Sequence, residues 1–120
     1  MDQVTVLFGN GKVNLEPKYN APLQALADKA KTINGYMVEI KGYASATGGA
    51  TANQMLSEER ADNVANFMRQ QGNVPLTNML APGAMGETRQ VATDNTVEGE
   101  ALNRRVVVRV LQNKAIAGIQ

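Results

Sequence analysis

The sequence contains neither cysteine nor histidine, and these two absences exclude several kinds of site. Without cysteine the chain has no disulfide framework and no thiolate ligand for a metal ion. Without histidine it lacks the commonest general base and the commonest zinc ligand. The lack of cysteine does not identify the cellular compartment, because periplasmic domains, like cytoplasmic ones, often lack cysteine.

Long apolar runs and an excess of charge of one sign are also absent. The 12 basic and 11 acidic residues give a formal net charge of +1, which argues against a broad nucleic-acid interface. No run approaches the roughly 18 apolar residues of a membrane span. The start, Met1-Asp2-Gln3, has neither the basic nor the apolar region of a signal peptide. We therefore expect either a cytoplasmic protein or a domain of a longer exported protein.

What the sequence does contain is the composition of one globular domain. Hydrophobic residues make up 43% of the 120 residues, which is enough for a single core. We expect this domain to span residues 1–112 and a flexible tail to span residues 113–120.

Short runs of β-branched and apolar residues predict the strands. The candidates are residues 4–8, 36–40 and 106–111, with a weaker one at residues 79–81. The run at 106–111 is almost continuously apolar, which predicts a central position in the sheet.

Two longer segments repeat apolar residues at helical spacing, and each is amphipathic. The first spans residues 17–33 and the second runs from about residue 50 to residue 71, where Gly72 fits a helix stop. A polar loop over residues 87–95 and a short helix over 96–102 complete the prediction. Strands that alternate with helices of this length predict an α/β fold with helices packed on a sheet.

Arg60 is the feature of the second helix that needs an explanation. On a helical wheel it falls between Leu56 and Val64, inside the apolar arc, and Asn53 lies one heptad earlier in the same arc. A polar group on a core-facing stripe must find a partner. Two interpretations remain open: Arg60 is structural, covering the sheet edge or pairing with a carboxylate, or it faces a pocket and grips a ligand carboxylate with two parallel hydrogen bonds.

The loop before this helix and the helix start support the second interpretation. The loop is uncharged and carries Gly48-Gly49, which would let a ligand approach the backbone closely. The amino end of a helix adds partial positive charge. Arg60, the glycine-containing loop and the helix start all favour an anionic group on the ligand.

The order and spacing of several blocks resemble one known family. The blocks are Asn53, Leu56-Ser57 and Arg60-Ala61 after Gly42 and Gly48, then Gly83 and Gly86, then Asn103-Arg104-Arg105-Val106. This pattern resembles the OmpA-like domain, the peptidoglycan-associating domain of outer-membrane protein A, of peptidoglycan-associated lipoproteins and of flagellar stator proteins. The resemblance spans roughly residues 4–110.

The resemblance implies a fold, a location and a ligand. The fold is a two-layer βαβαβ-type α/β sandwich, with a mixed sheet and two long helices on one face. The location is the periplasm, as a domain of an outer-membrane-associated protein whose signal or anchor is not in this chain. The ligand is the diaminopimelate residue of the peptidoglycan stem peptide, bound without a covalent bond; no cofactor, no metal and no nucleic acid are implied.

The resemblance also implies the ligand-binding residues. Arg60 stands at the position that takes the ligand carboxylate. Ser45 stands where the family keeps an aspartate for the ligand ammonium, and Asn53, Thr47 and Arg105 fall on other positions of the ligand shell. The exchange of aspartate for Ser45 should cost roughly 1.5–3 kcal/mol, or about 10- to 150-fold in affinity. We therefore expect a weakened or altered pocket.

Two further functions compete with wall binding. The domain could be an OmpA-like scaffold that has lost peptidoglycan binding and assembles with protein partners in the cell envelope, in which case Arg60 is structural. It could also be an enzyme, but a nucleophile would need lysine or a carboxylate as its base, and Ser45 and Ser57 lack the Ser-x-x-Lys spacing. We expect no enzymatic activity and no catalytic residue.

Overall fold

The computed structural model describes residues 2–9, 11–43, 50–80, 83–86 and 104–112. The elements in these residues are β1 (Gln3–Leu7), the 3-10 turn η1 (Pro17–Tyr19), α1 (Asn20–Ala30), β2 (Tyr36–Tyr43), α2 (Ala50–Gln70), the 3-10 turn η2 (Leu76–Asn78), β3 (Gly83–Gly86) and β4 (Arg105–Gln112). The loop predicted at 87–95, the helix predicted at 96–102 and the tail predicted at 113–120 lie outside the described residues.

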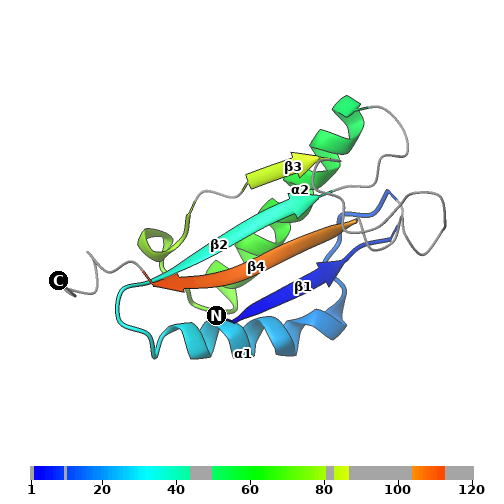
Figure 1. Ribbon diagram of the computed structural model, residues 1–120. Coiled ribbons are helices and arrows are strands. Elements are labelled where there is room, and N and C mark those ends of the chain that lie inside the picture. Colours follow the sequence, from blue (N-terminus) through cyan, green and yellow to red (C-terminus); the bar gives the residue numbers. More distant parts are fainter. Residues whose placement is uncertain (1, 10, 44–49, 81–82, 87–103, 113–120) are drawn as a thin grey trace.

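The described strands form one mixed sheet in the order β1-β4-β2-β3 (Figure 1). β4 pairs antiparallel with both β1 and β2, whereas β2 pairs parallel with β3. The predicted central position of residues 106–111 is confirmed, because β4 lies between β1 and β2.

The core lies on one face of this sheet. Along β4 the side chains of Val106, Val108 and Val110 are buried, whereas Val107 and Arg109 between them are only partly buried. Successive residues of a strand point to opposite faces, so the first set faces the core. The register extends this face across the sheet, since Val106 lies opposite Val6 of β1 and Gly42 of β2.

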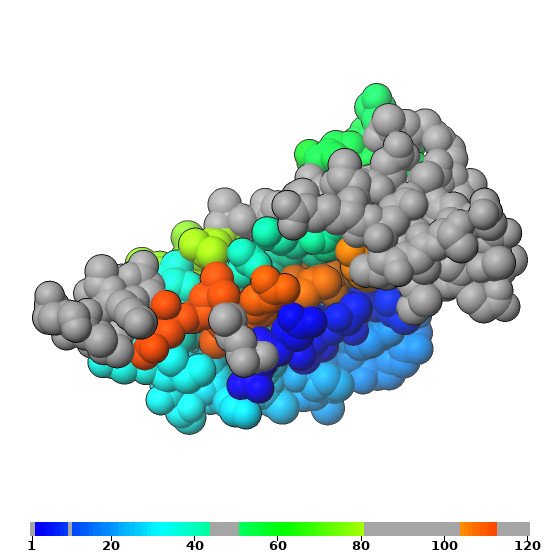
Figure 2. Space-filling model, viewed as in Figure 1, coloured from blue at the N-terminus to red at the C-terminus, as the bar shows by residue number. Residues whose placement is uncertain are grey.

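Both helices bury their apolar stripes against that face, in one contiguous core. The buried helical residues of this core are Leu23, Leu26, Ala27 and Ala30 of α1, and Ala61, Val64, Ala65 and Met68 of α2. Figure 2 shows the opposite side, where β1, β4 and β2 form the visible surface and α1 borders its lower edge. The predicted two-layer α/β sandwich, with its mixed sheet and two helices, is confirmed.

The boundaries of the first helix differ from the prediction for a local reason. Residues 17–19 form a 3-10 turn, and the α-helix covers only residues 20–30. Lys31, Thr32 and Ile33 continue the chain with turn hydrogen bonds back to residues 27–30 before Gly35 adopts a positive φ of 70°. The apolar pattern that predicted a helix to residue 33 therefore includes the turns at both ends.

The second helix ends where predicted, but Gly72 has a different role. The residue with left-handed φ is Asn73, at 54°. Gly72 is needed for space, because a Cβ atom there would lie 2.7 Å from the carbonyl oxygen of Met68 and 3.0 Å from Cβ of Ala27. The glycine therefore permits α1 and the end of α2 to pack closely.

The strand predicted at residues 79–81 is reduced to a single bridge. Met79 pairs with Val38, and the Leu80 amide donates to the Val38 carbonyl at 3.0 Å. The strand that follows is β3, which comes after Pro82 and pairs in parallel with the end of β2. No helix among the described residues is both long and apolar enough to cross a membrane.

Candidate functional site

The candidate site lies at the end of the sheet where β1 and β2 finish and β4 begins. Leu7 at the end of β1 pairs with Arg105 at the start of β4, and β2 ends beside them at Tyr43. The first half of α2 covers this end on the helix-covered face. Gly42 makes that contact possible, since a Cβ atom there would lie only 2.3 Å from the Ser57 carbonyl oxygen.

Arg60 is wholly buried beneath this end of the sheet, with 0% of its surface exposed. Its Nε donates to the carbonyl oxygen of Lys12 at 2.8 Å, and its Nη2 donates to that of Gly9 at 3.3 Å. Its Nη1 reaches the carbonyl oxygen of Tyr43 at 3.5 Å. The helical spacing correctly predicted that Arg60 points into the core side, and its partners in the described residues are backbone carbonyls rather than a carboxylate.

The surroundings of Arg60 oppose its charge. Burial, together with the nearby positive charge of Arg104, lowers the pKa of Arg60 to about 10. The aromatic ring of Phe8 lies 5.4 Å from the guanidinium carbon, within the range of a cation–π contact. The guanidinium nevertheless keeps its proton at neutral pH, so the site contains a buried positive charge.

Three side chains hold the backbone that leaves β1. Arg60 is one of these three. Asn63 Nδ2 donates to the Val13 carbonyl at 2.8 Å, and Arg104 Nε donates to the Phe8 carbonyl at 3.0 Å. Asn63 lies one helical turn after Arg60, so both reach the same connection from α2. We call the connection from Phe8 to Val13 the β1 exit; its residue 10 lies outside the described residues. The site residues predicted from the sequence include neither Asn63 nor Arg104, although helical spacing from Arg60 could have pointed to the first.

Asn53 is also buried, with 4% of its surface exposed, in the first turn of α2. One heptad separates it from Arg60, so the two residues lie on the same stripe of the helix. Ser57 between them is fully buried, and its hydroxyl donates to the Gln54 carbonyl at 2.8 Å. The polar stripe predicted from the sequence is therefore present. Ser45 and Thr47 lie outside the described residues.

Arg105 lies apart from this stripe. It is adjacent to Val106 in β4, and Val106 faces the helices, so strand alternation directs Arg105 to the other face of the sheet. There its guanidinium carbon lies 3.8 Å from the centre of the Tyr43 ring. Burial lowers the pKa of Arg105, while its electrostatic interaction with Tyr43 acts in the opposite direction. The arginine on the Arg60 side is Arg104, which the alternation along residues 106–111 could have indicated.

The two arginines of the site, Arg60 and Arg104, differ from several other basic residues of the described chain in their ion pairing. Between described residues, carboxylates pair with Lys18, Lys29, Lys41 and Arg109, and none of these pairs includes Arg60 or Arg104. No group of three or more acidic residues in the described part of the chain could hold a metal ion. The chemistry that this end of the sheet can offer is hydrogen bonding to an anion.

Comparison with known proteins places this chain and its fold in a family. The model of the OmpA family matches residues 7–104. The chain is 34% identical over 103 residues to the probable lipoprotein YiaD of Escherichia coli (strain K12), covering 86% of this chain and 46% of that protein. It is 34% identical over 105 residues to the peptidoglycan-binding protein ArfA of Mycobacterium tuberculosis (strain H37Rv), covering 88% of this chain and 32% of that protein. The chain thus spans less than half of these relatives.

A solved structure supports the fold independently. The crystal structure of the peptidoglycan-associated lipoprotein from Burkholderia pseudomallei superposes with a TM-score of 0.82 at 24% identity, covering 89% of each chain. The strand order and the two helices on one face are therefore those of a known architecture. The chain belongs to the OmpA family.

Proposed function

We propose that this chain is a periplasmic module that associates with peptidoglycan without a covalent bond, through a pocket beside Arg60. The observation that carries the proposal is the buried polar stripe of Asn53 and Arg60 at the end of the sheet, which are positions that the sequence resemblance assigns to the ligand. Arg104 adds a second positive charge. Neither Arg60 nor Arg104 forms an ion pair with a carboxylate among the described residues. The similarity to ArfA, named as a peptidoglycan-binding protein, supports the same ligand.

The donors of Arg60 suggest how a ligand carboxylate would bind. A guanidinium has five N–H donors. In the described part of the chain, the bonds to Gly9, Lys12 and Tyr43 use three of them. We assign the second N–H of Nη1 and of Nη2 to a carboxylate of the diaminopimelate residue. The carbonyl bonds would fix the orientation of the fork, so that little side-chain entropy is lost on binding.

Ser45 sets the expected strength of this association. The resemblance places it where an aspartate would receive the ligand ammonium, and a hydroxyl accepts that hydrogen bond without opposite charge. We propose that binding is therefore weakened by about 10- to 150-fold relative to an aspartate at this position. Thr47 would line the same loop, and Arg105 would act indirectly, by bracing Tyr43 from the other face.

The remaining parts of the proposal follow the resemblance. We propose that residues 1–112 act as the folded module, that it works in the periplasm as part of an outer-membrane-associated protein, and that it catalyses no reaction. Membrane attachment would come from parts of the parent protein outside this sequence.

Co-sedimentation with purified peptidoglycan tests the proposal. At low salt we expect the chain to be retained, and Arg60→Lys to be retained less, because an ammonium cannot form the two parallel bonds. Arg69→Lys, an exposed arginine on the same helix, is the matched control and should bind like the native chain. No retention of the native chain at low salt would overturn the proposal.

A second function is favoured by one specific observation. Arg60 is wholly buried and donates to two carbonyls of the β1 exit and to the Tyr43 carbonyl at the end of β2, as a structural arginine would. On this alternative the domain is an OmpA-like scaffold for protein assembly that no longer binds the wall. Arg60→Lys would then lower stability and leave retention on peptidoglycan at the background level of the native chain.

A further inference from the structure

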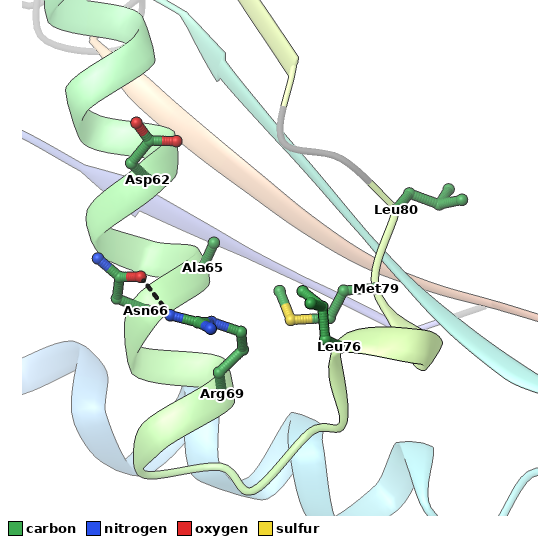
Figure 3. Close-up of a pocket in the computed structure, with 7 residues that line it drawn as sticks. All are labelled: Asp62, Ala65, Asn66, Arg69, Leu76, Met79 and Leu80. Carbon is green, nitrogen blue, oxygen red and sulfur yellow. Dashed lines mark hydrogen bonds between the residues drawn. The ribbon is translucent and has the colours of Figure 1, made fainter.

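A groove on the opposite side of α2 from the β1 exit belongs to no part of the proposed ligand site. Asp62, Asn66 and Arg69 of α2 form one wall, and the segment after the helix forms the other (Figure 3). The remaining lining residues are Ala65, Leu76, Met79 and Leu80. The groove has a volume of about 300 Å³.

The apolar wall of this groove includes two exposed leucines. Leu76 has 70% of its surface exposed and Leu80 has 38%. They are two of the three large hydrophobic residues that are exposed in the described part of the chain, the third being Met55. Exposed apolar residues that gather beside polar ones are typical of a contact surface.

The polar wall carries one charge of each sign at a fixed spacing. Asp62 and Arg69 are seven residues apart, so they lie on one stripe of α2, about 10.5 Å apart along its axis. Neither takes part in an ion pair with another described residue. Arg69 Nη2 donates to Asn66 Oδ1 at 3.0 Å, and the guanidinium turns along the helix toward Asn66 (Figure 3).

This arrangement is complementary to itself. When a second copy of α2 runs antiparallel across the first, about a two-fold axis that passes between Ala65 and Asn66, Asp62 of each copy lies opposite Arg69 of the other. Such an isologous contact forms both ion pairs at once. The same operation brings the exposed Leu76 and Leu80 of each copy toward the groove of the other. A partner of a different kind would need its own matching pair of charges, whereas a second copy supplies them automatically.

We propose that the groove formed by α2 and residues 76–80 is a contact surface between two copies of this chain, with Asp62 and Arg69 paired reciprocally. The surface is small, so the association is weak, with a Kd above about 1 μM, and would act where the protein is concentrated. It lies away from Arg60, and the dimer leaves the proposed ligand site free.

Sedimentation velocity over a concentration series up to about 1 mM, at 50 mM salt, tests the proposal. We expect a concentration-dependent rise from monomer to dimer that weakens at 500 mM salt, because the paired charges are screened. Asp62→Arg and Arg69→Asp should each weaken association by at least about 10-fold, since each places like charges opposite one another at both contacts. Asp28→Arg, a charge reversal on the exposed side of α1, is the matched control and should associate like the native chain.

A mixture of the two variants gives the decisive measurement. A chain with Asp62→Arg faces a partner with Arg69→Asp, with opposite charges at both contacts, so the mixture should recover a dimer that neither variant forms alone. Circular dichroism would confirm that each variant is folded. A native chain that stays monomeric at the highest concentration, or a mixture that does not recover association, would overturn the proposal and would point to a different partner for the groove.

Discussion

Arg60 Nε donates a hydrogen bond of 2.8 Å to the carbonyl oxygen of Lys12, which joins the middle of α2 to the connection that leaves β1. The bond lies where water cannot compete, because no part of Arg60 is exposed. A buried charge with several aligned acceptors is costly to remove, since the acceptors are left without a donor. Arg60 therefore contributes to the fold whatever it does for a ligand.

Arg60→Ala should lower the free energy of unfolding by about 3–5 kcal/mol, because it removes the donor to three carbonyls in a closed site. Arg60→Lys should cost less, about 1–3 kcal/mol, since the ammonium keeps the charge but cannot reach all three carbonyls. Urea denaturation at low micromolar protein concentration measures both losses.

Arg69→Ala is the control for this prediction. Arg69 is exposed on the same helix, and its loss should change the free energy of unfolding by no more than about 0.5 kcal/mol. Equal losses for the alanine variants at positions 60 and 69 would contradict the structural role of Arg60.

The pKa of Arg60 predicts how stability responds to pH. Burial lowers it to about 10, so the guanidinium is protonated in both the folded and the unfolded chain at pH 6–8 and contributes no slope there. Above pH 10 the folded chain releases this proton first. The unfolded chain then binds more protons, and the contribution of Arg60 makes stability rise with pH.

The sequence has no histidine that would titrate between pH 6 and 8. We therefore expect the free energy of unfolding of the native chain to change by less than about 0.5 kcal/mol over this range, as urea midpoints at fixed ionic strength would show. A sigmoidal change centred near pH 7 would show that a group with a strongly shifted pKa has been overlooked.

Sequence patterns that depend on neighbours along the chain predicted most of the fold. The almost continuous apolar run at residues 106–111 indicated a central strand, and the helical wheel placed Arg60 and Asn53 on the buried stripe. The family resemblance implied the mixed sheet with two helices on one face. The 3-10 turn at residues 17–19 was missed because its apolar spacing continues that of the helix behind it.

Features that depend on pairing between distant segments could not be predicted in the same way. β3 rather than residues 79–81 forms the edge strand, since the parallel register with β2 begins only at Lys41 and Gly83. The carbonyl partners of Arg60 carry no side-chain signal in the sequence. Arg105 was assigned to the pocket by resemblance, and only the register of β4 shows that Arg104 lies on the side of Arg60.

Gly42→Ala should separate α2 from β2. The added Cβ atom would lie 2.3 Å from the Ser57 carbonyl oxygen, which is backbone and cannot rotate away. We expect a loss of about 2–4 kcal/mol in the free energy of unfolding, measured by urea or thermal denaturation. Gly9→Ala is the control, because the nearest atom to its Cβ is the flexible Cδ of Lys12 at 3.3 Å, and it should cost less than about 1 kcal/mol. Equal losses would show that α2 can shift away from β2 at little cost.

Ser45→Asp should strengthen association with peptidoglycan by about 10- to 150-fold, because a carboxylate would add opposite charge to the hydrogen bond with the ligand ammonium. Binding isotherms with purified peptidoglycan at low salt measure the gain, and the gain should shrink at 500 mM salt as the charges are screened. Ser45→Asn is the matched control: its side chain has nearly the shape of aspartate without the charge, so it should gain little. An equal gain for both variants would assign the effect to side-chain size. Unchanged binding for Ser45→Asp would remove Ser45 from the ligand shell and leave recognition to the stripe of Asn53 and Arg60.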